Sequence, residues 1–212
     1  MWMIISFFSK AINIFFPPLC FGCKTENKTL CDNCLKRCKR AIDTPAIWII
    51  SIYDFQDILI KKVIHSIKYY HRRDLIKPFA EILSKELKNS DIYKTKGNSL
   101  ILVPIPMPKL RKYLRGYNQA ELITRELAKN INLPYGDDLL IRLKTTKRQA
   151  KISSRKERIN NQKNSFYASK EVANLNIILI DDVTTTGATL NEARETLIKS
   201  GALSVNALTI AH

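Results

Sequence analysis

Two adjacent carboxylates, Asp181 and Asp182, end the apolar run "NLNIILIDD" and stand directly before a threonine-rich loop. Successive side chains of an extended strand point to opposite faces, so these acids suit two neighbouring hydroxyls better than a side-by-side clamp on one metal ion. The loop from Thr184 to Thr189 leads to a predicted helix start, where free backbone N–H groups and the helix dipole favour a phosphate. Carboxylates for a diol beside donors for a phosphate describe a phosphorylated ribose.

Other phosphate-binding motifs are absent from the sequence. The chain has six glycines and contains neither GxxxxGK[ST] nor GxGxxG, which disfavours a P-loop and a dinucleotide fold. The threonine hydroxyls add donors, and Gly187 permits a close approach of the backbone to a ligand. An ordinary capped helix after a strand would explain Thr189, but it would not explain two acids at the strand end.

Four cysteines form two C-x-x-C pairs in "CFGCKTENKTLCDNC": Cys20 with Cys23, and Cys31 with Cys34. Four thiolates at this spacing complete the tetrahedron of a structural zinc site, which leaves no position for water and therefore has no catalytic role. A redox pair or disulfides are the less favoured alternatives. Cys38 lies one helical turn after Cys34 and could replace it, and the spacing does not decide which of the two binds.

The chain is strongly basic, with 35 Lys and Arg against 19 Asp and Glu and a formal net charge of +16. This excess favours phosphorylated ligands, nucleic acid or an anionic membrane surface, although a solvated basic surface explains it equally well. The segment 142–163 is rich in cations, and Arg148, Arg155 and Arg158 are its candidate contacts to a nucleic-acid backbone. It has no interleaved aromatic residues for base stacking, which weakens the case for a single-strand groove there.

The N-terminal stretch "MWMIISFFSKAINIFF" is apolar, but Lys10 interrupts it and no small-residue cleavage site follows. Its uninterrupted apolar length is below the roughly 20 residues of a membrane span, so we expect a short packed helix and leave contact with a membrane surface open. All five cysteines lie between positions 20 and 38, which argues against a secreted disulfide framework. We therefore expect a cytoplasmic protein.

The elements that must position these residues alternate between strands and helices. Apolar residues recur at helical spacing over 58–67 and 75–87, and again in the helix that follows the basic loop "KLRKYLRGYNQ". Strands are predicted in "TPAIWIISIYDF", "SLILVPIPMP", "NLNIILIDD" and "LSVNALTI", and the region 136–170 is predicted to be irregular, with one short helix at most. The segment "TLNEARETLIKSG" predicts a helix with a capping box from Thr189 to Glu192. The resulting βαβ order predicts an α/β fold with a mainly parallel sheet flanked by helices.

The stretch "ILIDDVTTTGAT" resembles the phosphoribosyl-pyrophosphate signature of type I phosphoribosyltransferases. Nearly the whole chain is similar to the ComF family of competence proteins: the paired C-x-x-C after an apolar N-terminus, "IHSIKYY", "VPIP" before "RGYNQAEL", "RQAKISSRKERINN" and the closing "ALTIAH". The signature alone indicates the superfamily, whereas "RGYNQ" together with the cysteine pairs indicates ComF. The resemblance implies a phosphoribosyltransferase type I-like domain over 45–212 and a helix with a small four-cysteine zinc module over 1–44.

The resemblance also implies how the signature contacts its ligand. Asp181 and Asp182 would hold the ribose hydroxyls of phosphoribosyl pyrophosphate. The loop that would cradle the 5-phosphate consists of Val183, Thr184, Thr185, Thr186, Gly187, Ala188 and Thr189.

A second segment is implied to serve the pyrophosphate. Pro104 and Ile105 would lie near it, with Mg²⁺ bridging it to the sugar. Arg115 is the candidate for neutralising the departing pyrophosphate, and Asn118 and Gln119 would position nearby groups.

Two functions compete at this point. The signature implies an enzyme that transfers a phosphoribosyl group, whereas ComF membership implies handling of incoming single-stranded DNA in natural transformation, with competence-machinery proteins as partners. Both can hold together. The alternatives are a nucleotide-metabolism phosphoribosyltransferase with no DNA role and a non-catalytic zinc-stapled adaptor. The sequence names no acceptor, because the region that would select one contains the zinc module.

Overall fold

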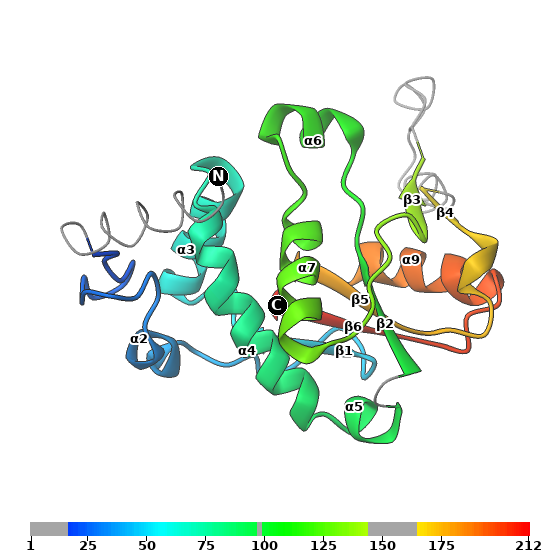
Figure 1. Ribbon diagram of the computed structural model, residues 1–212, viewed down its shortest axis with the longest axis horizontal. Helices are drawn as coiled ribbons and strands as arrows, with labels where there is room; N and C mark the ends of the chain where they lie inside the picture. The colour runs from blue at the N-terminus through cyan, green and yellow to red at the C-terminus, as the bar shows by residue number, and fades with distance from the viewer. Residues whose placement is uncertain (1–16, 97–98, 144–164) are drawn as a thin grey trace, which may run out of the picture.

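Four parallel strands form the main sheet of the protein, in the order β1-β6-β5-β2 (Figure 1). The computed structural model describes residues 17–96, 99–143 and 165–212. The strands are Ile49–Tyr53 (β1), Leu100–Pro104 (β2), Asn176–Val183 (β5) and Ser204–Ala211 (β6). Each strand coincides with one of the predicted apolar runs, and their parallel pairing confirms the predicted α/β sheet.

Helices cover both faces of this sheet (Figure 1). Along β5, Ile178 and Ile180 belong to a core shared with α3, α4 and α7, whereas Ile177 and Leu179 belong to a second core shared with α9. Because alternate side chains are buried on opposite faces, this strand is apolar at successive positions. The helices are Ile58–Tyr69 (α3), Ile76–Asn89 (α4), Gln119–Ile131 (α7) and Ala188–Lys199 (α9).

Shorter helices connect these layers. Asp32–Arg37 (α2) lies in the N-terminal module, a 3₁₀ turn at Arg73–Leu75 (η1) precedes α4, and Asp91–Lys96 (α5) follows α4. Lys109–Arg115 (α6) lies on an arm between β2 and α7 that projects away from the sheet (Figure 1). This arm was predicted as a basic loop. The prediction was wrong because α6 has only seven residues, four of them cationic, and buries none of its side chains, so its apolar residues do not form a core-facing stripe.

The region predicted to be irregular contains a second, antiparallel sheet. Leu140–Arg142 (β3) pairs with Phe166–Ala168 (β4), and a 3₁₀ turn at Lys170–Val172 (η4) follows. The prediction of irregular structure was wrong at these positions, because the strands are very short and lie far apart in the sequence. A local pattern does not reveal such a pairing.

The predicted cap of α9 was also wrong. The helix begins at Ala188 with Gly187 as its N-cap, so Thr189 lies inside the helix. The Glu192 carboxylate does not complete a capping box and accepts a hydrogen bond from the Ser165 backbone N–H at 2.6 Å. The helix starts earlier than the capping-box spacing indicates, because a left-handed glycine ends the loop.

The N-terminal module shares the core of the main domain. Cys20, Leu30 and Leu35 pack in the same cluster as side chains of α3 and α4. The boundary between 1–44 and 45–212 stays a prediction, and the helix predicted over residues 1–16 lies outside the described residues. Among the helices that the structure describes, none combines the length and the apolar character that crossing a membrane requires.

Candidate functional site

The two acids of β5 lie at the carboxyl end of the sheet and face different neighbours. Asp182 Oδ2 forms an ion pair with Nζ of Lys68, near the end of α3, at 2.9 Å, and the two side chains are 14% and 23% exposed. Asp181 Oδ1 accepts a hydrogen bond from the Asp182 backbone N–H at 2.8 Å, and Arg142 of β3 is among the charges that act on this carboxyl. The two carboxylates are therefore held by separate contacts.

Burial raises the pKa of the Asp181 carboxyl to about 7, and the negative charge of Asp182 adds to the rise. The Asp182 backbone N–H and the positive charges of Lys68 and Arg142 oppose this rise without cancelling it. The site thus contains one carboxyl that changes its charge near neutral pH, beside another that is paired with a lysine.

The end of β2 lies beside the acids and is held there by an amide side chain. Pro104 is paired in register with Ile180, and the Ile105 backbone N–H donates to the Ile180 carbonyl at 2.9 Å. Asn118 donates from Nδ2 to the Ile105 carbonyl at 2.9 Å and accepts from the Ala120 backbone N–H at 3.2 Å. Asn118 therefore caps α7 and ties that helix to the end of β2.

A cavity of about 260 Å³ lies at these strand ends, and we call it the β5 cavity. Predicted site residues that line it are Asp181, Asp182, Val183, Thr189, Ile105, Asn118, Gln119 and Arg115. Tyr69 and the segment 106–108 also contribute, and four cationic side chains line the cavity: Lys68, Arg111, Arg115 and Arg142. Two carboxylates among four cations favour a ligand that combines hydroxyl groups with several negative charges.

Three of these cations, Lys68, Arg111 and Arg142, were not predicted as site residues. Arg142 lies in β3, where its guanidinium carbon is 5.1 Å from the centroid of the Phe166 ring, and burial lowers its pKa. The basic character of "KLRKYLRG" was a signal for Arg111. No spacing links Lys68 or Arg142 to the acids, so only the packing of α3 and β3 against the strand ends identifies them.

Gln119 offers a hydrogen-bond donor to the cavity. The residue is 2% exposed, and its Nε2 has no hydrogen-bond partner among the described residues. Its Oε1 accepts from Arg115 Nη1 at 2.7 Å, and the Arg115 guanidinium carbon lies 5.4 Å from the centroid of the Tyr69 ring. A buried donor without a partner costs about 1–3 kcal/mol unless a ligand or water satisfies it. Because Gln119 lines the β5 cavity, a ligand there can accept this hydrogen bond.

The threonines of the loop 184–189 do not all line the same cavity. Thr189 lines the β5 cavity, whereas Thr185 lines a separate cavity of about 410 Å³ together with His212. Thr184 is buried, and its carbonyl oxygen lies 3.3 Å from Nδ1 of His212. Thr186 is exposed, and its Oγ1 accepts a long hydrogen bond of 3.4 Å from a backbone N–H in the same turn. The predicted phosphate contacts of these threonines stay predictions.

Gly187 is required by the turn itself. Its φ is +72°, a left-handed conformation that side chains other than glycine rarely adopt. A Cβ at this position would also lie 3.0 Å from Cβ of Pro45. Packing against Pro45 therefore favours glycine here independently of any ligand, and the following residue, Ala188, is exposed.

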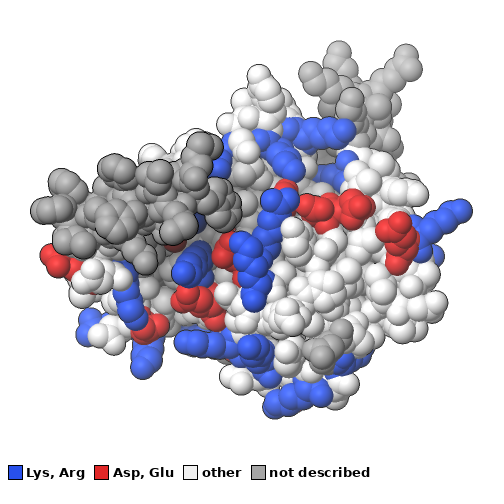
Figure 2. All heavy atoms as spheres, viewed as in Figure 1, with Lys and Arg blue, Asp and Glu red and all other residues white. Residues whose placement is uncertain are grey.

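Basic side chains gather over α6 on the face drawn in Figure 2. α6 carries two lysines and two arginines among its seven residues. The predicted nucleic-acid contacts Arg148, Arg155 and Arg158 lie outside the described residues. One such basic patch among the described residues thus lies on the arm beside the β5 cavity.

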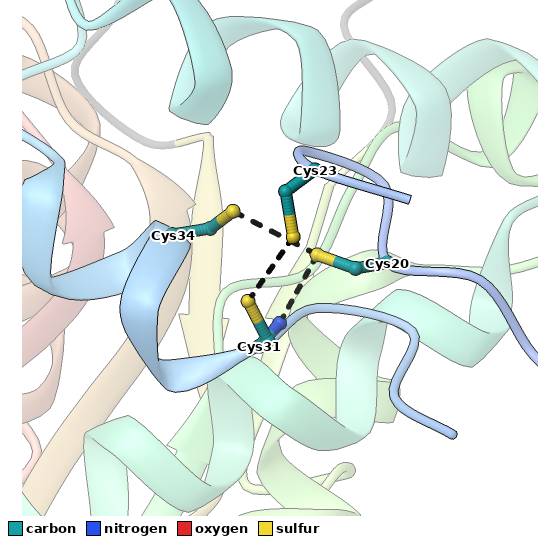
Figure 3. A group of neighbouring side chains, drawn as sticks. All are labelled: Cys20, Cys23, Cys31 and Cys34. Atoms are coloured by element: carbon teal, nitrogen blue, oxygen red, sulfur yellow. Dashed lines mark hydrogen bonds between the residues drawn. The ribbon is translucent and has the colours of Figure 1, made fainter. Parts of the chain in front are cut away.

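The sulfur atoms of Cys20, Cys23, Cys31 and Cys34 lie within 4.8 Å of one another and point toward a common centre (Figure 3). The Sγ–Sγ distance is 3.8 Å between Cys20 and Cys34 and 3.6 Å between Cys23 and Cys31. A tetrahedron of sulfurs bound at about 2.3 Å from a zinc ion has edges of about 3.8 Å. The predicted four-cysteine cluster is confirmed, and its geometry fits a tetrahedral metal ion.

The structure also distinguishes Cys34 from Cys38. The Cys38 thiol donates to the Cys34 backbone carbonyl at 3.3 Å and is not part of the cluster. Within the cluster, burial and the neighbouring sulfurs raise the pKa of Cys34 to about 12, whereas the Thr25 hydroxyl lowers the pKa of Cys23 to about 6. Four thiols this close resist ionising together, and a central cation would relieve their repulsion.

Curated proteins with similar sequences carry names from DNA uptake and DNA use. The chain is 31% identical over 193 residues to competence protein ComFC of Bacillus subtilis, and the alignment covers 91% of this chain and 71% of ComFC. It is 26% identical over 198 residues to DNA utilization protein YhgH of Escherichia coli K12, and this alignment covers 88% of this chain and 86% of YhgH. Competence protein F of Haemophilus influenzae is 37% identical over 103 residues, covering 47% and 44%. No family model matches the chain.

The solved structures that resemble this chain include two proteins whose names refer to phosphoribosyl groups. Glutamine phosphoribosylpyrophosphate amidotransferase from Bacillus subtilis matches with a TM-score of 0.43 and 16% identity, over 63% of this chain and 25% of that one. The chain thus spans about a quarter of the amidotransferase. Hypoxanthine phosphoribosyltransferase of Trypanosoma cruzi matches with a TM-score of 0.41 and 16% identity, over 63% of each chain.

Proposed function

The chain belongs to the ComF family of competence proteins, and from that premise we propose that its β5 cavity binds phosphoribosyl pyrophosphate in a cytoplasmic protein that serves DNA uptake. The similarity to ComFC over most of both chains places it in the family. The names of its relatives support the process. Single-stranded DNA and competence-machinery proteins are the partners that we propose for it. The chemistry of the cavity supports the ligand.

One observation carries the ligand assignment: two carboxylates share a cavity with four cations beyond the carboxyl ends of β2 and β5. In open parallel sheets, ligands bind beyond the carboxyl ends of the strands. A ribose diol matches the acids, and a phosphate with a pyrophosphate matches the cations. A ligand without a diol would leave the acids unused, and a neutral sugar would leave the cations unused.

The proposal gives each side chain a role. Asp181 and Asp182 accept hydrogen bonds from the two ribose hydroxyls, and Lys68 exchanges its ion pair with Asp182 for a phosphate oxygen. The 5-phosphate lies near Thr189 at the start of α9, where the helix dipole is favourable. Arg115 binds the pyrophosphate. Carboxylate oxygens are ligands of the type that Mg²⁺ prefers, and the ion would supply positive charge at the pyrophosphate when bound with the ligand.

The same arrangement suits transfer of the phosphoribosyl group as well as its binding. Departure of pyrophosphate places negative charge on the leaving group. In this proposal the guanidinium groups of Arg111 and Arg115, which line the cavity, would neutralise that charge. Release of pyrophosphate from bound ligand is the measurement that separates an enzyme from a binding protein. Binding without release favours the non-catalytic role in the uptake machinery.

For the cysteine cluster we propose a structural zinc ion. Four thiolate ligands leave no open position, so the ion would cross-link the N-terminal module and would take no part in the reaction. Cys20 and Cys31 are buried beside the main core, and the ion would therefore stabilise the packing of that module on α3 and α4.

Isothermal titration with phosphoribosyl pyrophosphate and Mg²⁺ tests the ligand assignment. The double variant Asp181→Asn/Asp182→Asn is expected to lose binding, because amides cannot replace two charged acceptors for the diol. Asp137→Asn/Asp138→Asn is the matched control, since these adjacent acids are exposed and do not line the cavity. Equal affinity of the wild type and the Asp181→Asn/Asp182→Asn variant would contradict the proposal.

A further inference from the structure

A second cavity of about 400 Å³ lies beside the β5 cavity, and we call it the α6 cavity. Its lining residues come from the end of α3, the turn after it, and α6: Lys68, Tyr69, His71, Arg111, Leu114 and Arg115. Lys68, Tyr69, Arg111 and Arg115 line the β5 cavity as well, so the two cavities share a wall. His71 and Leu114 belong to the α6 cavity alone.

Apolar and aromatic side chains at this cavity are unusually exposed. Leu114 is 73% exposed and Tyr69 60%, and Tyr70 beside it is 67% exposed. The His65 ring centroid lies 4.6 Å from that of Tyr69 and 5.6 Å from that of Tyr70, so these rings form one exposed aromatic group. Exposure of such a group to water is unfavourable in free energy, and a flat ring stacked on it would be stabilised by removing both surfaces from water.

Lys68 of this cavity is paired with Asp182, but the two arginines of the cavity are not neutralised by acids. Arg111 and Arg115 form no ion pair with a carboxylate anywhere in residues 17–96, 99–143 and 165–212. Arg115 contacts Gln119 and the Tyr69 ring. Exposed rings interleaved with free cations are the chemistry that binds single-stranded nucleic acid, because bases stack on the rings while phosphates contact the cations. A double helix hides its base faces and gains less from the rings.

We propose that the α6 cavity is the docking surface for single-stranded nucleic acid, with a base stacked on Tyr69 and phosphates on Arg111 and Arg115. This places the strand on the arm rather than on the basic segment 142–163. Because Arg111 and Arg115 also line the β5 cavity, the strand and phosphoribosyl pyrophosphate compete for the same cations. The choice of a single strand as partner and the competition with the sugar phosphate both rest on the proposed function, whereas the position of the docking surface rests on the α6 cavity itself.

Two substitutions on α6 separate this surface from the rest of the protein. Arg111, Leu114 and Arg115 lie three and four residues apart and form one face of the helix, so Tyr113 lies on the opposite face. Leu114→Asp places a negative charge in the α6 cavity, and Tyr113→Asp places the same charge on the outer face. Leu114 is 73% exposed and Tyr113 84%, so neither variant removes a core contact.

Fluorescence anisotropy with labelled oligothymidylate compares the two variants. At about 0.15 M salt, where the Debye length is about 8 Å, Leu114→Asp should weaken binding at least tenfold and Tyr113→Asp less than about twofold. Tyr69→Ala should also weaken oligothymidylate binding about tenfold. An abasic strand of equal length should bind the wild type about tenfold more weakly than oligothymidylate does. Equal affinities of the two α6 variants, or equal binding of the abasic strand, would overturn the proposal.

Other probes distinguish the occupant and the competition. If the wild type binds anionic phosphatidylserine vesicles but not oligothymidylate, the surface serves a membrane and the proposal fails. Phosphoribosyl pyrophosphate with Mg²⁺ should weaken oligothymidylate binding several-fold. Because coupling between two ligands is reciprocal, oligothymidylate should weaken the binding of phosphoribosyl pyrophosphate by the same factor. Leu114→Asp should weaken phosphoribosyl pyrophosphate binding far less than it weakens oligothymidylate binding, because Leu114 does not line the β5 cavity. If the wild type does not bind phosphoribosyl pyrophosphate, the proposed function fails. The oligothymidylate affinities of Leu114→Asp and Tyr113→Asp would still test the docking surface in that case.

Discussion

The cysteine cluster and the β5 cavity lie beside the same core but are assembled in different ways. The cluster takes all four of its sulfurs from one short segment, Cys20 to Cys34. The cavity takes side chains from α3, α6, α7, α9, β3 and β5, spread from Lys68 to Thr189. When all ligands of a site come from one short segment, the spacing of a single sequence motif reveals all of them. When the residues of a site come from distant segments, a motif reveals only those residues that lie within it.

The largest effect is expected from breaking the locally assembled site. Cys20 is fully buried, and Cys20→Ser should abolish binding of one zinc ion per chain and lower the melting temperature by at least about 10 °C, because structural zinc contributes about 10 kcal/mol or more to such modules. Metal analysis and thermal unfolding measure both effects. One zinc per chain in Cys20→Ser would show that the cluster is not the zinc site.

A smaller effect is expected from removing one wall of the tertiary site. Arg142→Met keeps the apolar stem but removes the charge, and should weaken phosphoribosyl pyrophosphate binding about tenfold, since a hydrogen bond to a charged group contributes about 1.5–3 kcal/mol. Arg40→Met is the control, because Arg40 pairs with Glu86 away from the cavity. Titration calorimetry on both variants provides the comparison, and unchanged affinity in Arg142→Met would exclude β3 from the site.

The unliganded cavity should make the stability of the protein depend on pH. Asp181 has a pKa of about 7 in the folded protein, against about 4 in an unfolded chain, so folding takes up a proton between these pH values. Its contribution to stability is fully present below pH of about 4 and is lost as the pH rises through about 7. Asp182, Lys68 and Arg142 are the charged groups that act on it.

Asp181→Asn imitates the protonated form and keeps an acceptor for the Asp182 backbone N–H. At a pH of about 8 the variant should melt a few degrees higher than the wild type, since each kcal/mol shifts the melting temperature by about 2–4 °C in a chain of this size. The difference should shrink as the pH falls to about 5. Thermal melts across this range test it, and a difference that grows on acidification would contradict the raised pKa.

The smallest effect is expected at the fifth cysteine. Cys38 is 6% exposed, and burial, with Asp57 nearby, raises the pKa of its thiol to about 12. It should therefore react very slowly with a thiol reagent in the folded protein, and Cys38→Ala should keep one zinc per chain and shift the melting temperature by only a few degrees. Loss of zinc in Cys38→Ala would reassign the fourth ligand from Cys34 to Cys38.

The main sheet was predictable because its strands are buried on both faces. The run ending at Ile180 is apolar throughout, and a run of this kind is typical of a parallel strand wherever it occurs. α6 was missed because its side chains stay in solvent, and β3 was missed because its partner strand lies far along the chain. The capping box at Thr189 was wrong because the left-handed Gly187, packed against Pro45, starts α9 earlier.

The cysteine cluster and the buried strand that ends in Asp181 and Asp182 can be read from the sequence, because each depends on residues that are close neighbours along the chain. The resemblance to the family can be read from it as well, because each of its short motifs is local. Packing of distant segments is what pairs Lys68 with Asp182, brings Arg142 near Asp181, and places the aromatic group around Tyr69 next to the same cations. Covalent connectivity sets distances within a turn or a short loop. Distances between residues far apart in sequence exist only once the helices and strands have packed, so no local pattern records them.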